Sequence, residues 1–82
     1  MKNLLTNHQL GKALHDQRKT KGIKQSTIAR NLKVSLSYIS KVENGKIPIY
    51  AFLLFQYCKA IDMPVQDIFN AIADALWFFN AD

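Results

Sequence analysis

A chain of 82 residues that is 49% hydrophobic and 21% charged is long enough for one small globular domain and too apolar to be disordered. A single cysteine excludes an intramolecular disulfide and a cysteine-based zinc site, and we expect no cofactor and no metal. No apolar run reaches the roughly 18 residues of a membrane span, and the N-terminus lacks the apolar core of a signal peptide. We therefore expect a cytoplasmic protein with no membrane contact.

Five segments have the apolar spacing of helices, and no segment alternates with a period of two, so the chain is predicted to be all-α. Residues 1–6 are expected to form a flexible N-terminal arm. Thr6 and Gln9 fit a capping box that opens a first helix at residue 7, and Gly22 is a natural stop after residue 21. The other predicted helices span residues 25–32, 36–43, 50–61 and 65–79, with Pro64 expected in the first turn of the last one.

The second and third predicted helices are short, and only a brief polar connection separates them. Ile28, Ala29 and Leu32 form one apolar stripe, and Ile39 and Val42 form another. Two short helices packed around a tight turn are typical of a helix-turn-helix, and the small side chain of Ala29 would let them cross closely. The outer face of the third helix is polar and slightly basic, as a helix that enters the DNA major groove needs to be.

The distribution of charge supports this interpretation. The net charge is +5, but residues 1–46 hold ten of the eleven Lys and Arg and only two acids, which gives +8, whereas residues 47–82 carry −3. A merely solubilising surface would explain the excess of charge but not its separation. The pattern therefore favours contact with a polyanion such as nucleic acid.

Groups that could support catalysis do not converge. His8 and His15 are seven residues apart on the first helix, with no cysteine or acidic cluster near them in the sequence. The serines of the second and third helices have no local histidine partner and no nucleophile elbow. We therefore expect no enzyme and no catalytic residues.

Residues 10–48 hold several motifs in a fixed order. They are L-G-x-x-L followed by Arg18, G-I-x-Q at residues 22–25, Ala29, and I-S-x-x-E-N-G-K at residues 39–46. With these motifs the run resembles the phage-repressor and Cro type of helix-turn-helix domain, the XRE family, and the resemblance extends to about residue 69. It implies a compact five-helix, lambda-repressor-like domain over residues 7–70, with the helix-turn-helix at helices 2 and 3. It also implies sequence-specific binding of double-stranded DNA by a transcription regulator, most often a repressor.

The resemblance also assigns roles to residues. Arg18 and Glu43 match a pair that family members often use as an internal ion pair, and both are expected to be structural. Gln25 matches a position that contacts a phosphate and can brace the third helix, and Asn44 matches one whose backbone N–H or amide donates to a phosphate. The expected phosphate-binding residues are Lys24, Gln25, Arg30, Lys33, Ser40, Asn44 and Lys46, and the expected base-reading residues are Ser35, Leu36, Ser37, Tyr38 and Lys41.

Physical chemistry refines the base-reading set. Lys41 can donate to guanine O6 and N7, and Leu36 can touch a thymine methyl group. Two alternatives stay open at this point, namely that Leu36 tucks inward and that Tyr38 is partly buried against the loop after the third helix. Lys33 occupies a turn position that usually holds glycine, where a positive φ costs a non-glycine residue on the order of 1 kcal/mol.

The last predicted helix carries more apolar residues than one face can bury. We expect residues 71–82 to supply a dimerisation surface, so that a homodimer reads a short inverted repeat. The alternatives are that its end folds back or frays, or that it serves a protein-binding accessory module or an antitoxin-type subunit. One stripe holds Val65, Ile68, Phe69, Ile72, Leu76 and Phe79, and the expected dimer interface holds Ala71, Ala75, Trp77 and Phe78.

Overall fold

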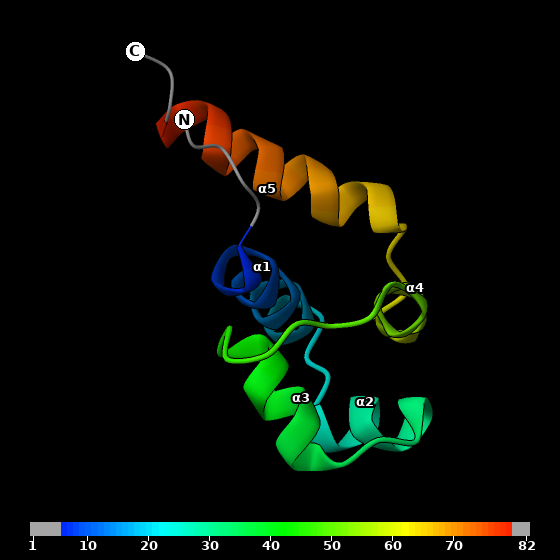
Figure 1. The fold of residues 1–82 in the computed structure, drawn as a ribbon. Coiled ribbons are helices and arrows are strands. Elements are labelled where there is room, and N and C mark those ends of the chain that lie inside the picture. The colour runs from blue at the N-terminus through cyan, green and yellow to red at the C-terminus, as the bar shows by residue number, and fades with distance from the viewer. Residues whose placement is uncertain (1–5, 80–82) are drawn as a thin grey trace.

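The computed structural model describes the backbone of residues 6–79 and the side chains of residues 6–74. The prediction of an all-α chain is confirmed, because this part of the chain forms five helices and no strand. They are α1 (Asn7–Thr20), α2 (Gln25–Leu32), α3 (Leu36–Glu43), α4 (Ala51–Ala60) and α5 (Val65–Phe79) (Figure 1).

The first helix begins at the predicted capping box. The Thr6 hydroxyl accepts the Gln9 N–H at 3.1 Å, and the Gln9 side-chain oxygen accepts the Thr6 N–H at 2.9 Å. These two bonds satisfy donors that the first turn of a helix leaves without backbone partners. Helix α1 ends at Thr20, and Gly22 follows with a φ of 72°.

The turn between α2 and α3 is tight. Lys33 takes up the left-handed conformation, with a φ of 59°, and the Val34 N–H returns to the Ala29 carbonyl oxygen at 3.0 Å. Ser35 then caps α3, because its hydroxyl accepts the Tyr38 N–H at 3.0 Å. A left-handed residue is what lets the chain stop one helix and start the next within three residues.

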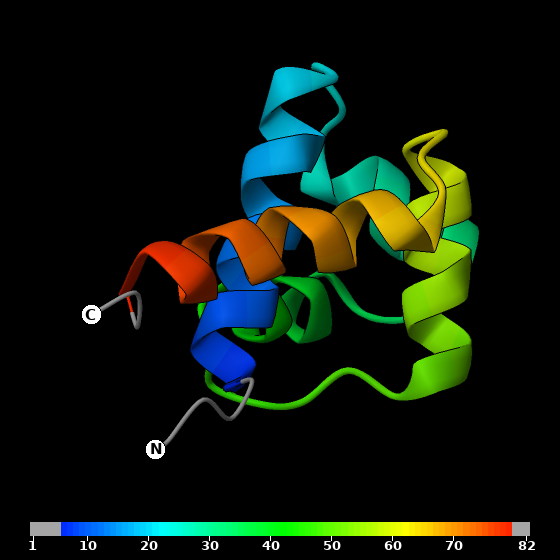
Figure 2. The same ribbon diagram turned by 90° about the horizontal axis from the view of Figure 1, so that it is seen from above.

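The hydrophobic core is shared by all five helices. Helix α1 lies in the middle, with α3 packed on one side and α5 on the other, and α2 packs against α3 and α4 (Figures 1 and 2). The fully buried side chains come from every layer of this arrangement. They include Leu14, Ile28, Ile39, Tyr57, Ile61 and Ile68.

The last two helices differ in detail from the prediction. Helix α4 is one residue shorter at each end, and α5 begins at Val65, so Pro64 precedes the helix and is not in its first turn. Ile68 and Ile72 face α1 and are buried, as one stripe should be. Phe69, expected on that stripe, is 40% exposed, because it is about 100° around the helix from Ile68 and points away from the core.

Candidate nucleic-acid interface

Helix α3 presents one buried side and one exposed side. Because the sequence predicts that this helix enters the DNA major groove, we call it the recognition helix. Ile39, Val42 and Glu43 are buried. Ser37 and Lys41 lie on the opposite side and are exposed. Leu36 is 50% exposed at the start of the helix, so the alternative of an inward Leu36 does not occur.

Two of the five expected base-reading residues have additional structural roles. Ser35 is exposed, but its hydroxyl already accepts the N–H of Tyr38 as the cap of α3. Tyr38 is half-buried against the core, and its hydroxyl is buried without a hydrogen-bond partner in the described part of the chain. Burial raises the pKa of this hydroxyl. The alternative that Tyr38 is partly buried therefore holds. Of the five residues, Leu36, Ser37 and Lys41 are the most accessible to a bound duplex.

The expected phosphate-binding residues surround the recognition helix. Lys24 lies just before α2, Arg30 on its last turns, Lys33 in the turn and Lys46 in the loop after α3, and all four are exposed. Asn44 is also exposed, but its backbone N–H donates to the Ser40 carbonyl oxygen at 3.0 Å. Its side-chain amide donates to the same oxygen at 2.9 Å and lies 3.4 Å from the Ser40 hydroxyl. A phosphate at this corner would therefore meet the side-chain amide of Asn44, in place of its long bond to the Ser40 hydroxyl, and not its backbone N–H.

Arg18 and Glu43 form a buried ion pair between α1 and the end of the recognition helix. Arg18 Nε lies 2.8 Å from Glu43 Oε2, and Arg18 Nη2 lies 2.9 Å from Glu43 Oε1. The third donor of the guanidinium, Nη1, reaches the Ile23 carbonyl oxygen at 2.7 Å. The two-pronged geometry matches the planar guanidinium fork to the carboxylate.

The carboxylate of Glu43 gathers further donors. The side-chain amide of Gln25 donates to its Oε1 at 3.0 Å, and the Tyr57 hydroxyl donates to its Oε2. Burial by itself raises the pKa of Glu43, but the hydrogen bonds from Arg18, Tyr57 and Gln25 outweigh burial and leave the pKa below its ordinary value. The hydrogen bond with Glu43 raises the pKa of Arg18. Glu43 is therefore held as a carboxylate inside the domain.

Tyr57 is the member of this cluster that sequence reasoning missed. It lies on α4, and its ring is fully buried. A buried tyrosine needs a partner for its hydroxyl, so a tyrosine within an otherwise apolar helix could have been a signal for an internal acceptor. Nothing in the spacing of residues 43 and 57 points to the pairing.

Gly11, the glycine of the L-G-x-x-L motif, permits the close crossing of α1 and α3. A Cβ atom at this position would clash with the Val42 carbonyl oxygen and would lie 3.1 Å from that of Glu43. Only a residue without a side chain lets α1 pass this close to the end of the recognition helix.

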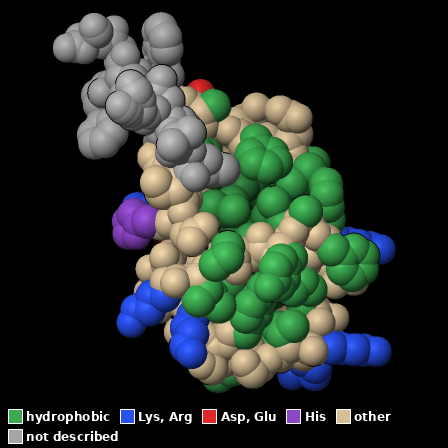
Figure 3. Space-filling view, viewed as in Figure 1, with side chains coloured by type: hydrophobic (Ala, Val, Ile, Leu, Met, Phe, Trp, Pro, Cys, Tyr) green, Lys and Arg blue, Asp and Glu red, His purple; other side chains and the backbone are tan. Residues whose placement is uncertain are grey.

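Basic and hydrophobic side chains share the face of the molecule seen in Figure 3. Lys and Arg side chains project at the edges of this face, mostly in the lower half of the view, where Figure 1 places α2 and α3. Hydrophobic side chains gather over the middle of the face and reach down between them (Figure 3).

The fold matches that of known proteins. A family model described as helix-turn-helix, HTH_3, covers residues 14–68, more than half of the chain. The chain belongs to this helix-turn-helix family. The predicted membership of the phage-repressor and Cro type, or XRE family, is confirmed, and the HTH_3 protein is a DNA-binding transcription regulator.

Solved structures of regulators share the fold of the HTH_3 protein. The clp gene regulator ClgR from Corynebacterium glutamicum has a TM-score of 0.86 at 29% identity, with 98% of this chain and 85% of that chain covered. A second ClgR structure gives 0.81 at 30% identity, covering 88% and 94%. The restriction-modification controller C.AhdI from Aeromonas hydrophila gives 0.71 at 24% identity, covering 76% and 94%, which shows the fold alone. No curated protein sequence matches the chain significantly.

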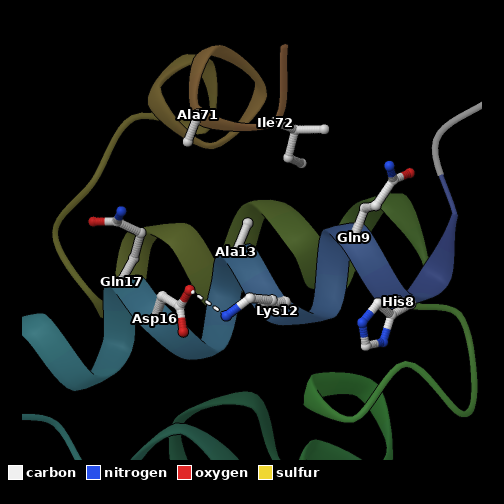
Figure 4. A pocket seen from close by; sticks show the side chains of 8 residues that line it. All are labelled: His8, Gln9, Lys12, Ala13, Asp16, Gln17, Ala71 and Ile72. Atoms are coloured by element: carbon white, nitrogen blue, oxygen red, sulfur yellow. Dashed lines mark hydrogen bonds and ion pairs between the residues drawn. The ribbon is translucent and has the colours of Figure 1, made fainter. Parts of the chain in front are cut away.

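A hollow of about 220 Å³ lies between α1 and α5 of the HTH_3 protein, on the side of α1 away from the recognition helix (Figure 4). Ala13, Ala71 and Ile72 give it an apolar wall, and Lys12 and Asp16 pair across its edge at 3.1 Å. Within the described residues, no three His, Cys, Asp or Glu side chains come together as a metal site would need, and no helix is long and apolar enough to cross a membrane. The hollow takes no part in the surface around α3.

Of the expected dimer interface, the structure places only Ala71, which is exposed on α5. Ala75, Trp77 and Phe78 lie outside the residues whose side chains are described. The described part of the chain exposes other large apolar residues, namely Tyr50, Phe52, Phe55 and Phe69.

Proposed function

We propose that this regulator reads a specific double-stranded DNA sequence with the recognition helix in the major groove, and that it does so as a homodimer acting as a repressor. The observation that carries the proposal is the exposed side of α3. Leu36, Ser37 and Lys41 are exposed there, and the basic residues of α2 and of the segments next to α2 and α3 are exposed as well. All of the residues of this surface lie within the proposed domain of residues 7–70. Binding without chemistry is the mechanism, carried out in the cytoplasm where the DNA is.

Base reading falls to three side chains of different chemistry. The ammonium of Lys41 donates to guanine O6 and N7, and the exposed Leu36 side chain contacts a thymine methyl group. Ser37 both donates and accepts, so it discriminates weakly between bases. Tyr38 and Ser35 support the helix and stand at the margin of the read sequence.

Phosphate contacts position the helix and supply the attraction. Lys24, Arg30, Lys33 and Lys46 neutralise phosphates on either side of the groove, with Gln25, Ser40 and Asn44 as neutral donors. The amide of Gln25 already gives one hydrogen to Glu43, so its second amide hydrogen or its backbone N–H would meet the phosphate.

A homodimer is supported by the apolar surface of α4 and α5. Phe52 and Phe55 on α4 are 70% and 57% exposed, and Phe69 and Ala71 on α5 are also exposed. An apolar patch of this kind on a small domain usually marks an interface. Residues 71–82, with Ala75, Trp77 and Phe78, would extend it. In such a dimer, two recognition helices about 34 Å apart would read an inverted repeat.

The same surface is the observation behind a second candidate function. It could hold a different protein, which would make the chain the DNA-binding subunit of an antitoxin-type or accessory complex. The relatives named above are described as regulators, one of clp genes and one of a restriction-modification system. The description of the clp gene regulator, at 29% identity, supports transcription control for this chain.

The deciding experiment is selection of bound duplexes from a random-sequence pool at near-physiological salt, followed by sequencing. Enrichment of an inverted repeat is the expected result. Enrichment of a single half-site would keep the specific reading and remove the dimer. If no sequence is enriched and binding only weakens with salt, the specific reading is wrong.

The selected duplex also tests the role of Lys41. Lys41→Ala should weaken binding to the selected duplex by about 1–3 kcal/mol and binding to a scrambled duplex by much less. Lys59→Ala, which removes an equal charge from α4, is the matched control and should leave the ratio of the two affinities unchanged. An equal loss on both duplexes for Lys41→Ala would remove it from the base-reading set.

A further inference from the structure

The carboxylate of Glu43 joins the end of the recognition helix to the rest of the domain. Glu43 is the last residue of α3, and its side chain is 2% exposed. It accepts hydrogen bonds from Arg18 on α1, from Gln25 on α2 and from Tyr57 on α4. Three helices thus hold one carboxylate. Through it they fix the position of the last turn of α3.

Tyr57 differs from the other two donors because its helix packs against α2 and α5 more than against α3. Its ring is fully buried, so the hydroxyl cannot turn to water. The acceptors within reach are Glu43 Oε2 and the Leu14 carbonyl oxygen, the latter at 3.3 Å. A hydroxyl has one hydrogen to donate, and a carboxylate is the stronger acceptor, so the bond is made to Glu43.

The position of the last turn of α3 matters more for reading bases than for attraction to DNA. Lys41 lies two residues before Glu43, in the same turn, so a shift of Glu43 moves the backbone that carries Lys41. Hydrogen bonds to base edges weaken steeply outside a narrow range of distance and angle. Phosphate contacts by long, exposed lysines accommodate such a shift by changing side-chain rotamers.

We propose that Tyr57 is a positioning residue for DNA recognition. Its hydroxyl, by donating to Glu43, holds the last turn of α3 in the geometry in which Lys41 meets a base edge. The inference rests on the proposed function, in which α3 enters the major groove. It assigns to α4 a part in sequence discrimination although α4 supplies no DNA contact.

The test compares Tyr57→Phe with Tyr50→Phe in the full chain. Both remove one hydroxyl, but Tyr50 is an exposed residue ahead of α4. Affinities are measured for the duplex obtained by selection and for a scrambled duplex of the same length. If the geometry that this hydrogen bond maintains is needed for recognition, losing a bond to a charged group lowers the affinity about tenfold or more. We expect Tyr57→Phe to lower the affinity for the selected duplex by that factor and the affinity for the scrambled duplex by less than about twofold. The salt dependence of binding should not change. We expect Tyr50→Phe to change neither.

A second comparison tests whether Tyr57 acts through Glu43. In a Glu43→Met background, which has no acceptor oxygen at this position, Tyr57→Phe should cost little further specific affinity, because the bond that it removes is already absent. Additive losses, equal losses on both duplexes, or no loss would each overturn the proposal. Circular dichroism shows whether each variant is folded at the assay temperature. A Tyr57→Phe protein that does not fold would also overturn the proposal, since the hydroxyl would then serve the fold alone. If the unmodified protein does not distinguish the two duplexes, the proposed function fails, and that outcome is recognised before any variant is made.

Discussion

Two ion pairs of this domain differ in what they contribute because they differ in exposure. The side chains of Arg18 and Glu43 are 7% and 2% exposed, whereas those of Lys12 and Asp16 are 66% and 51% exposed. A buried carboxylate that loses its cation is left without compensation, while an exposed one is solvated by water. The first pair should therefore matter to folding and the second hardly at all.

Replacing each cation by methionine measures that difference. Arg18→Met should lower the free energy of unfolding by about 3–5 kcal/mol, because Glu43 stays buried with only neutral donors. Lys12→Met should lower it by at most about 0.5 kcal/mol, as is usual for an exposed pair four residues apart on a helix. Urea unfolding followed by circular dichroism gives both values. Comparable losses for the two variants would contradict the structural role given to Arg18.

Glu43 also makes the stability depend on pH. Its pKa is below the ordinary value in the folded domain, so the ionised form favours folding. This contribution is fully present above the unfolded pKa, about 4.3, and is lost as the pH falls through the lower folded pKa. We expect the free energy of unfolding to decrease on acidification below about pH 4, and to decrease less in Glu43→Gln. Urea midpoints between neutral and acid pH test this, and parallel curves for the two proteins would contradict it.

At the level of the elements, the helix-turn-helix depends on a strained turn. Lys33 has a φ of 59° and Asp62, in the turn after α4, a φ of 54°, and each ends a helix with a residue other than glycine. The left-handed conformation costs such residues roughly 1–2 kcal/mol. Lys33 is therefore strained. Its ammonium group also puts a positive charge near the proposed DNA-binding surface.

Two substitutions separate the strain from the charge at this turn. Lys33→Gly should raise the free energy of unfolding by about 0.5–1 kcal/mol, because glycine adopts a positive φ without strain. Lys33→Ala keeps the strain and should not raise it. Both remove the same charge, so both should weaken general DNA binding equally and should reduce its salt dependence by about one phosphate contact. A gain in stability with alanine as large as with glycine would show that the charge, not the backbone, is unfavourable at this position.

At the scale of the whole molecule, the exposed basic residues of the α2–α3 region come from other elements than the apolar part, which is made by the exposed Phe52 and Phe55 of α4 and Phe69 of α5. The basic residues attract a polyanion, and the apolar part can bury area against a protein. Because the hydrophobic effect scales with buried area, the exposed phenylalanines are the side chains that gain most from a second copy.

A charge within this apolar part should prevent dimerisation. Phe55→Glu should shift the protein from dimer to monomer in sedimentation experiments without DNA, because the carboxylate would be buried unpaired in the interface. Ser26→Glu adds the same charge to the exposed surface of α2 and should leave the dimer intact. If Phe55→Glu remains a dimer, the interface lies elsewhere, and residues 71–82 become the part to examine.

Much of the fold was readable along the chain, because its signals are local. The capping box at Thr6, the glycine at residue 22 and the apolar periodicity of α2 and α3 act over three or four residues, which is the range over which helix geometry is set. The predicted helices therefore agree with the observed ones to within one residue, and the family motifs predicted a helix-turn-helix protein. The same motifs pointed to Arg18 and Glu43, which the structure brings together.

What only the tertiary structure decided concerns residues far apart in sequence and the rotation of each helix about its axis. The sequence by itself determined that α5 carries more apolar residues than one face can bury. Packing against α1 and α2 determined that Tyr57 and Ile68 point inward while Phe55 and Phe69 point out, and that the Tyr57 hydroxyl meets a carboxylate 14 residues earlier in the chain. The periodicity of a helix shows which of its faces is the most hydrophobic. When two faces are almost equally hydrophobic, the face that becomes buried depends on how closely neighbouring helices can pack against it.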